Sequence, residues 1–282
     1  MALGSVAGRY GHSSVKTVVR ATRAMGHAME RLAGGVRIHD AGDDPVGGGV
    51  ADSLRATSES TRIAARNIND GLGILAVADG SASEVASLLV RMREVLVQGS
   101  SDAISADARG ALGRELDLIR AAIDQVAASC TFNGTSLLNG ALADITIQVG
   151  ARFDPGGAGS ADTLDVPLFD ATVAGLGVGA AVVTLGTASS ARGSLAVVDE
   201  AITAVSAGRA GFGATGNRLD DALRTIEGLE ASSATMEARI RDADFGIEAA
   251  SLAQAQVMQQ AGAAVLAQTR RLRADALQLL PR

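Results

Sequence analysis

The sequence predicts a mainly α fold: a long antiparallel coiled-coil helical bundle formed by both termini, with a small β-hairpin region in mid-chain. Apolar residues recur at spacings of three, four and seven along most of the 282 residues, and they alternate with polar residues in one central stretch. Apolar residues make up 47% of the chain but aromatic residues only 2%. Helix-to-helix seams of Ala, Leu, Val and Ile are therefore expected rather than a pocket lined by aromatic rings.

The first helix is expected near the N-terminus. Its apolar residues alternate at spacings of three and four, with Thr22 as the one weak member, which is typical of a heptad seam. The seam residues are Val15, Val18, Met25, Met29, Leu32 and Val36. Glycines, aspartates and Pro45 within residues 34–49 break this pattern, so a turn-rich connection is expected next.

Two inner helices are expected before the middle of the chain. The first repeats an apolar residue every seven positions, at Ile68, Leu75, Ala82, Leu89 and Leu96. In the connection that follows, Ser105 is a suitable N-cap and Asp107 places an acid in the first turn of the next helix. That helix carries a seam from Leu112 to Val126, and Cys130 takes the next seam position. We therefore expect a buried rather than a reactive thiol.

The character of the chain changes after these helices. Asn133-Gly134 and Asn139-Gly140 are turn signals, and apolar residues alternate with polar ones between Ile145 and Val149. The stretch 141–191 is rich in glycine, and we expect it to form a small exposed β region.

The second half of the chain mirrors the first. Helical periodicity resumes in residues 195–205 and 219–240, and a last segment carries an apolar residue every seven positions. The seam residues of this segment are Met258, Val265, Leu272 and Leu279. We expect it to pair with the first helix. The predicted organisation is nested: residues 1–40 plus 245–282 form a terminal coiled-coil domain, residues 41–140 plus 192–244 a helical rod domain, and residues 141–191 an inserted β region.

The chemistry of catalytic and ligand-binding sites is not evident in the sequence. His12, His27 and His39 have no partners at metal-ligand spacing, and no phosphate-binding loop or nucleophile motif is found, so we expect no metal, no cofactor and no enzyme activity. The acids in residues 40–44 are expected to shape turns and cap helices. The net charge of −6 offers no surface for nucleic acid. Neither a cleaved signal peptide nor a membrane span is expected.

Several short segments, in the same order along the chain, resemble bacterial flagellin. They are Gly35–Ile38, Asp43–Asp44, Arg66–Gly71, Val90–Gln98, Phe132–Gly134, Leu137–Gly140, Ile147–Gly150, Asn217–Leu219, Arg239–Asp244 and Gln259–Gly262. Both ends of the chain carry the resemblance, and only the middle lacks it. The short insert suggests a form without large outer domains.

The resemblance implies a structural subunit that polymerises with copies of itself into the helical filament of the bacterial flagellum, outside the cell. It also implies flagellar cap, hook-junction and export-chaperone proteins as partners, and it makes the two terminal seams the polymerisation contacts. Arg91, Arg93 and Glu94 match a family segment that a host innate receptor recognises. A hook–filament junction protein is the alternative, although the Gln-Gln-Ala-Gly segment 259–262 favours flagellin. A catalytic module in residues 141–191 is a third interpretation, and the lack of His and Lys in this glycine-rich stretch argues against it.

Overall fold

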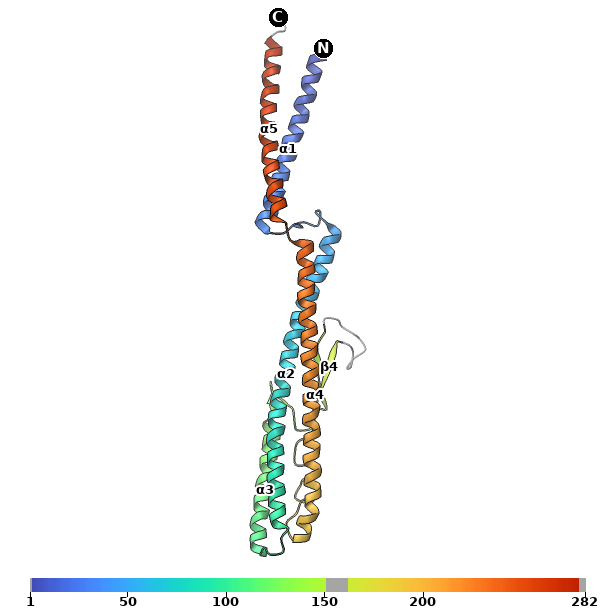
Figure 1. Ribbon diagram of the computed structural model, residues 1–282, viewed down its shortest axis with the longest axis vertical. Helices are drawn as coiled ribbons and strands as arrows, with labels where there is room; N and C mark the ends of the chain where they lie inside the picture. Colours follow the sequence, from blue (N-terminus) through green and yellow to red (C-terminus); the bar gives the residue numbers. More distant parts are fainter. Residues whose placement is uncertain (1, 151–161, 279–282) are drawn as a thin grey trace. The chain divides into compact units, whose positions relative to one another are not determined.

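The computed structural model describes residues 2–150 and 162–278, and side-chain surroundings for residues 13–150 and 162–271. Its helices are α1 (Ala2–Gly34), α2 (Pro45–Gly99), α3 (Ala106–Ser129), α4 (Ala188–Arg241) and α5 (Phe245–Gln278) (Figure 1). Its strands are β1 (Thr131–Phe132), β2 (Thr135–Ser136), β3 (Asp144–Gln148) and β4 (Thr163–Pro167). Because the terminal helices α1 and α5 pack together and the strands form two small antiparallel sheets, the fold class expected from the sequence is confirmed.

The chain forms two compact units. One comprises Met1–Ala56 and Ser232–Arg282, and will be called the terminal unit; the other, Thr57–Ala231, will be called the central unit.

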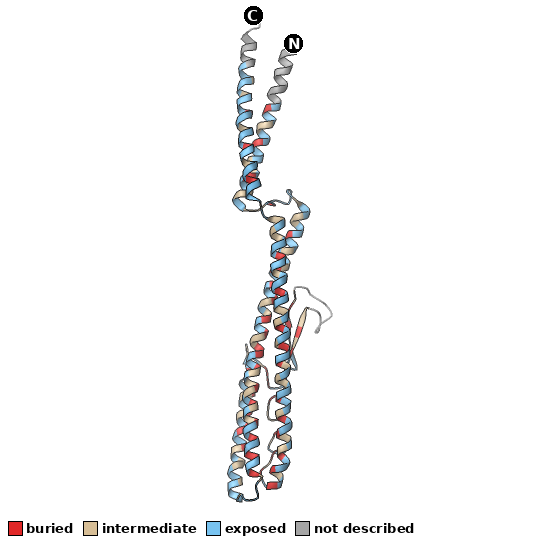
Figure 2. Cartoon of the chain, viewed as in Figure 1, coloured by how far each residue is buried: buried red, intermediate tan, exposed pale blue. Residues whose placement is uncertain are grey.

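The central unit has a core between α2, α3 and α4, and its buried residues follow these helices (Figure 2). All five residues of the predicted α2 seam are buried. On α3, Leu116, Ile119 and Ile123 are buried as their spacing indicated, while Leu112 and Val126 are half-buried. Each fully buried Leu or Ile contributes about 1.5–3 kcal/mol to stability, so the α2 and α3 seams are a substantial source of stability in the unit.

The ends of α3 follow the sequence prediction. Ser105 is the N-cap, since its hydroxyl accepts a hydrogen bond from the Ala108 amide, and Asp107 lies in the first turn. Cys130 follows the last turn, is 2% exposed, and has its Sγ 3.9 Å from the carbonyl oxygen of Val77. The expected burial of this thiol is confirmed.

The β region is less exposed than expected. Strands β3 and β4 pair from Asp144↔Pro167 to Gln148↔Thr163, and one face of the pair buries Ile147, Leu164 and Val166 in the core of the central unit. Strand β1 turns into β2 through Asn133 and Gly134, both at positive φ, as a two-residue hairpin requires.

A buried arginine ties the connection between β4 and α4 to α3. Arg120 Nε donates a hydrogen bond to the carbonyl oxygen of Val178 at 3.0 Å, and its Nη2 donates to that of Val183. Its Nη1 lies 2.6 Å from Asp117 Oδ1. One guanidinium group thus satisfies two carbonyl oxygens of a segment that has no regular secondary structure.

Within the described chain, α2 contains one window of 18 residues, of mean hydropathy 1.4, that could cross a membrane by length and composition. A third of the window is buried inside the structure. Core helices of soluble proteins have the same property, and the absence of a membrane span stays a prediction.

Candidate assembly surface

The two terminal helices meet along a stripe of small residues. On α1 the buried positions are Ser14, Ala21 and Ala28, at intervals of seven. On α5 they include Ala255 and Gly262, again seven apart. A Cβ atom added to Gly262 would lie only 2.6 Å from Val18 Cγ2, so a larger residue there would require the Val18 side chain to move. The periodicity is that of a coiled coil, but the seam is thin.

The predicted seam residues fall into an exposed set and a half-buried set, and the half-buried Val18 lies against Gly262 of the stripe. Val15, Met29, Met258 and Val265 are exposed, at 49%, 49%, 45% and 52%. Val18, Met25, Leu32 and Val36 are half-buried. The side chains of Leu272 and Leu279 lie outside the described residues. The sequence showed the interval of seven and the half-buried Val18, Met25 and Leu32, but not the small residues between them, which are the most deeply buried because they allow the helices to approach closely.

Of the nineteen large apolar residues that are exposed in the described chain, eight lie on these two helices, which is a higher share for their described length than in the rest of the chain, and six lie on the longer α2. The eight are Val15, Val19 and Met29 on α1, and Phe245, Ile247, Val257, Met258 and Val265 on α5. Figure 2 shows how little of the pair is buried in comparison with the helices of the central unit. Apolar surface concentrated in this way is typical of a surface that packs against another molecule.

The end of the α1–α5 pair that adjoins the 35–44 turn is held by charged groups that sequence reasoning missed. Arg31 Nη1 lies 3.2 Å from Oε1 of Glu248, and its Nη2 lies 3.7 Å from Oδ1 of Asp43. Asp43 Oδ2 accepts hydrogen bonds from the amides of His39 and Asp40. These backbone hydrogen bonds, and then the charge of Arg31, hold the pKa of Asp43 below its ordinary value.

The three residues of the receptor-like segment are exposed on α2. Arg91 pairs with Glu94 at 3.0 Å and with Glu115 of α3 at 2.6 Å, and the hydrogen bond with Glu115 raises the pKa of Arg91. Arg93 pairs with Asp199 of α4 at 2.7 Å. Both arginines thus join helices of the central unit; recognition by a receptor stays a prediction.

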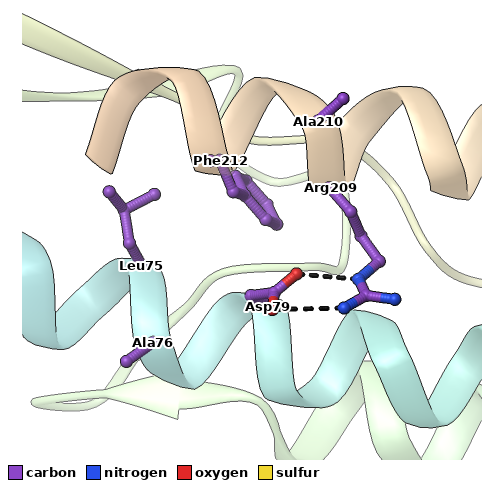
Figure 3. A pocket seen from close by; sticks show the side chains of 7 residues that line it. Leu75, Ala76, Asp79, Arg209, Ala210 and Phe212 are labelled. Carbon is purple, nitrogen blue, oxygen red and sulfur yellow. Dashed lines mark hydrogen bonds and ion pairs between the residues drawn. The ribbon is translucent and has the colours of Figure 1, made fainter. Parts of the chain in front are cut away.

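One shallow depression of about 480 Å³ lies between α2 and α4, and it is lined by Leu75, Ala76, Asp79, Arg209, Ala210, Phe212 and Gly213 (Figure 3). Its charged groups satisfy each other, since Arg209 Nε donates to Asp79 Oδ1 at 2.7 Å and the bond raises the pKa of Arg209. In the part of the chain that the structure describes, no group of three or more His, Cys, Asp or Glu residues could hold a metal ion. The ion pair of Asp79 with Arg209 leaves the depression without a nucleophile or a free general base.

A helical core with satisfied polar groups, and a pair of terminal helices that expose apolar residues, together define a self-associating structural protein. The comparisons with known proteins agree. Residues 12–143 match the bacterial flagellin N-terminal helical region, and residues 195–280 match the bacterial flagellin C-terminal helical region. The chain belongs to the bacterial flagellin family.

Relatives match over nearly their whole length. The flagellin of Halalkalibacterium halodurans is 30% identical over 253 residues, which cover 90% of each chain. The flagellin of Bacillus subtilis is 29% identical, with 89% of this chain and 91% of the relative covered. Among solved structures, the crystal structure of Bacillus cereus flagellin has a TM-score of 0.49 and 27% identity, covering 57% of this chain and 88% of that one.

Proposed function

We propose that the protein is a non-enzymatic structural subunit that self-assembles into the bacterial flagellar filament used for swimming. One observation supports this best: the exposed large apolar residues of α1 and α5 have no covering partner among the described residues, although the core of the central unit is well filled. Polymerisation would remove this apolar surface from water, and the hydrophobic effect would drive it.

The polymerisation contacts that we propose are the predicted seams. Val15, Val18, Met25, Met29, Leu32 and Val36 would act on α1, and Met258, Val265, Leu272 and Leu279 on α5. The exposed apolar residues of α1 form one surface, and those of α5 form another with a different set of side chains. A contact between the α1 surface of one copy and the α5 surface of the next is heterologous, and such a contact generates an open helical polymer when the rotation between copies does not close a ring.

We also propose how the chain is divided into domains, how it leaves the cell and which proteins it meets. The terminal domain comprises residues 1–40 and 245–282, the rod domain residues 41–140 and 192–244, and the insert residues 141–191. The subunit leaves the cell without a cleaved signal peptide and acts in the extracellular filament. It meets flagellar cap, hook-junction and export-chaperone proteins on the way. The junction-protein alternative gains no support, because the relatives that match over most of the chain are flagellins and filament core proteins.

Seeded polymerisation tests the proposal. Purified subunit added to short filament fragments should grow filaments visible by negative-stain microscopy, and Val265→Asp should abolish growth because it places a charge in the proposed contact. Val182→Asp is the matched control, since Val182 is as exposed (54%) but lies outside the terminal helices. Normal growth of the Val265→Asp subunit would show that this surface is not the contact.

A further inference from the structure

Five passages of the chain converge in the terminal unit. Charged side chains join the end of α1, the turn 35–44, the start of α2, the end of α4 and the start of α5. We call this cluster the clasp and define it as Arg31, Arg37, Asp43, Asp44 and Glu248. It lies where α1 and α5 connect to the rest of the terminal unit.

Arg31 joins α1 to α5. Its partner Glu248 is buried, with 11% of its side chain exposed, in the first turn of α5, where the helix dipole also favours a negative charge. Its second partner, Asp43, is fixed by two backbone amides of the turn. A single guanidinium group therefore bridges α1, the turn and α5, which is a geometry that lysine cannot reproduce.

Arg37 joins the turn to α4 and α2. Its Nη2 donates to the carbonyl oxygen of Ile240 at 2.9 Å and lies 3.5 Å from Asp44 Oδ2. Asp44 also accepts a hydrogen bond from the Gly47 amide in the first turn of α2. Backbone hydrogen bonds run alongside, from the amide of Arg37 to the carbonyl oxygen of Arg241 and from the amide of Ala243 to that of Gly35.

The clasp contrasts with the rest of the α1–α5 contact. The stripe of Ser14, Ala21, Ala28, Ala255 and Gly262 buries little apolar area per residue, and an isolated helix pair of this kind gains little from packing. Apart from the contact of Val18 with Gly262, small residues repeated every seven positions allow neighbouring registers with similar contacts. The ion pair of Arg31 with Glu248 forms in the register that the structure describes, and a shift of one helix along the other would separate the two groups.

We propose that the clasp, acting through the Arg31–Glu248 pair, sets the register and order of α1 against α5 and so positions the two exposed apolar surfaces for assembly. This inference rests on the proposed function. Arg31 and Glu248 are positioning residues: they hold the assembly surface without forming part of it.

The test combines amide exchange on the monomer with the critical concentration for seeded polymerisation. In Arg31→Met and in the milder Glu248→Gln, amides of α1 and α5 should exchange faster, while those of α2 between Ala82 and Leu96 keep wild-type rates. The critical concentration should rise about tenfold for Arg31→Met, because an unpaired buried carboxylate disfavours the assembly-competent register. The critical concentration and the exchange rates of Arg31→Lys should lie between those of the wild type and Arg31→Met, because lysine keeps the charge but cannot bridge both carboxylates.

Arg20→Met is the matched control. Arg20 lies on the exposed side of the same helix and has no ion pair within the described part of the chain, so its replacement should change neither readout. The inference is overturned if Arg31→Met and Glu248→Gln match Arg20→Met in both readouts, or if exchange in α2 accelerates as much as in α1 and α5. If wild-type subunits never polymerise but Arg31→Met still accelerates amide exchange in α1 and α5, the proposed function is wrong, while the role of the clasp in ordering the two helices is supported.

Discussion

At the scale of residues, glycine at position 262 is required by space rather than by backbone conformation. The Cβ atom of any other residue would overlap Val18, whose backbone also lies within 4 Å of that position. Gly262→Val should therefore destabilise the helix pair by about 1–3 kcal/mol, as overpacking of a tight contact does. Amide exchange in α1 and α5 would detect the change.

Gly113 supplies the matched control. It lies within α3, and an added Cβ would meet nothing within 4 Å. Gly113→Ala should stabilise the central unit by about 0.5–1 kcal/mol through helix propensity, measured by urea unfolding. A neutral effect of Gly262→Val would mean that the helices are farther apart than described.

Asp43 gives the clasp a pH dependence. Since its pKa is lower in the folded protein than the ordinary 3.8, the carboxylate adds stability that is fully present above pH 3.8 and is lost as the pH falls through the lowered pKa. The stability difference between wild type and Asp43→Asn should shrink as the pH is lowered below 3.8, measured by urea unfolding at each pH. Asn keeps an acceptor for the turn amides, so parallel pH curves for the two proteins would argue against a role for the charge.

At the scale of elements, the sequence predicted helices better than the contact between them. The α2 seam was identified residue by residue because large apolar side chains every seven positions are also the ones that are buried. In α1 and α5 the same rule chose exposed residues, such as Val15 and Val265, together with half-buried ones, such as Val18. The most deeply buried positions were missed, since alanine and glycine let the helices meet and carry only a weak hydrophobic signal.

The charged clasp could not be predicted for a different reason. Arg31 and Glu248 are 217 positions apart, and no local pattern links them. Only the role of Asp43 and Asp44 in the turn could be predicted from the sequence, because backbone capping depends on neighbours in the sequence. The structure of the long connection after β4 could not be predicted either, since it depends on hydrogen bonds from Arg120. In the sequence, nothing distinguishes Arg120 from the other polar residues of α3.

Arg120 leads to a prediction about that connection. Arg120→Met preserves the apolar stem but leaves the carbonyl oxygens of Val178 and Val183 without their donor, which should cost about 2–4 kcal/mol. Limited proteolysis should then cut the central unit within residues 173–185. Arg114→Met, an exposed position on the same helix, should leave the cleavage pattern unchanged. Resistance of the Arg120 variant would mean that packing of Val178 and Val183 alone orders the segment.

At the scale of the whole molecule, the two units differ in what they bury. The largest fully buried side chains, among them Ile68, Leu89, Met92, Ile123 and Leu219, all belong to the central unit. The described terminal unit buries mainly small residues; apart from the buried Ile38, its larger apolar side chains are half-buried or exposed. Local stability follows buried apolar area, so the two units should open with different free energies.

Amide exchange on monomer and filament should reveal this difference. In the monomer, amides of α1 and α5 should exchange at least about a hundredfold faster than those of the buried α2 seam, because opening the helix pair exposes little apolar surface. In the filament, neighbouring copies would cover the exposed surfaces of α1 and α5, so protection there should rise far more than in α2. Equal protection of both units in a verified monomer would contradict this account, because the terminal helices would then gain no order from assembly.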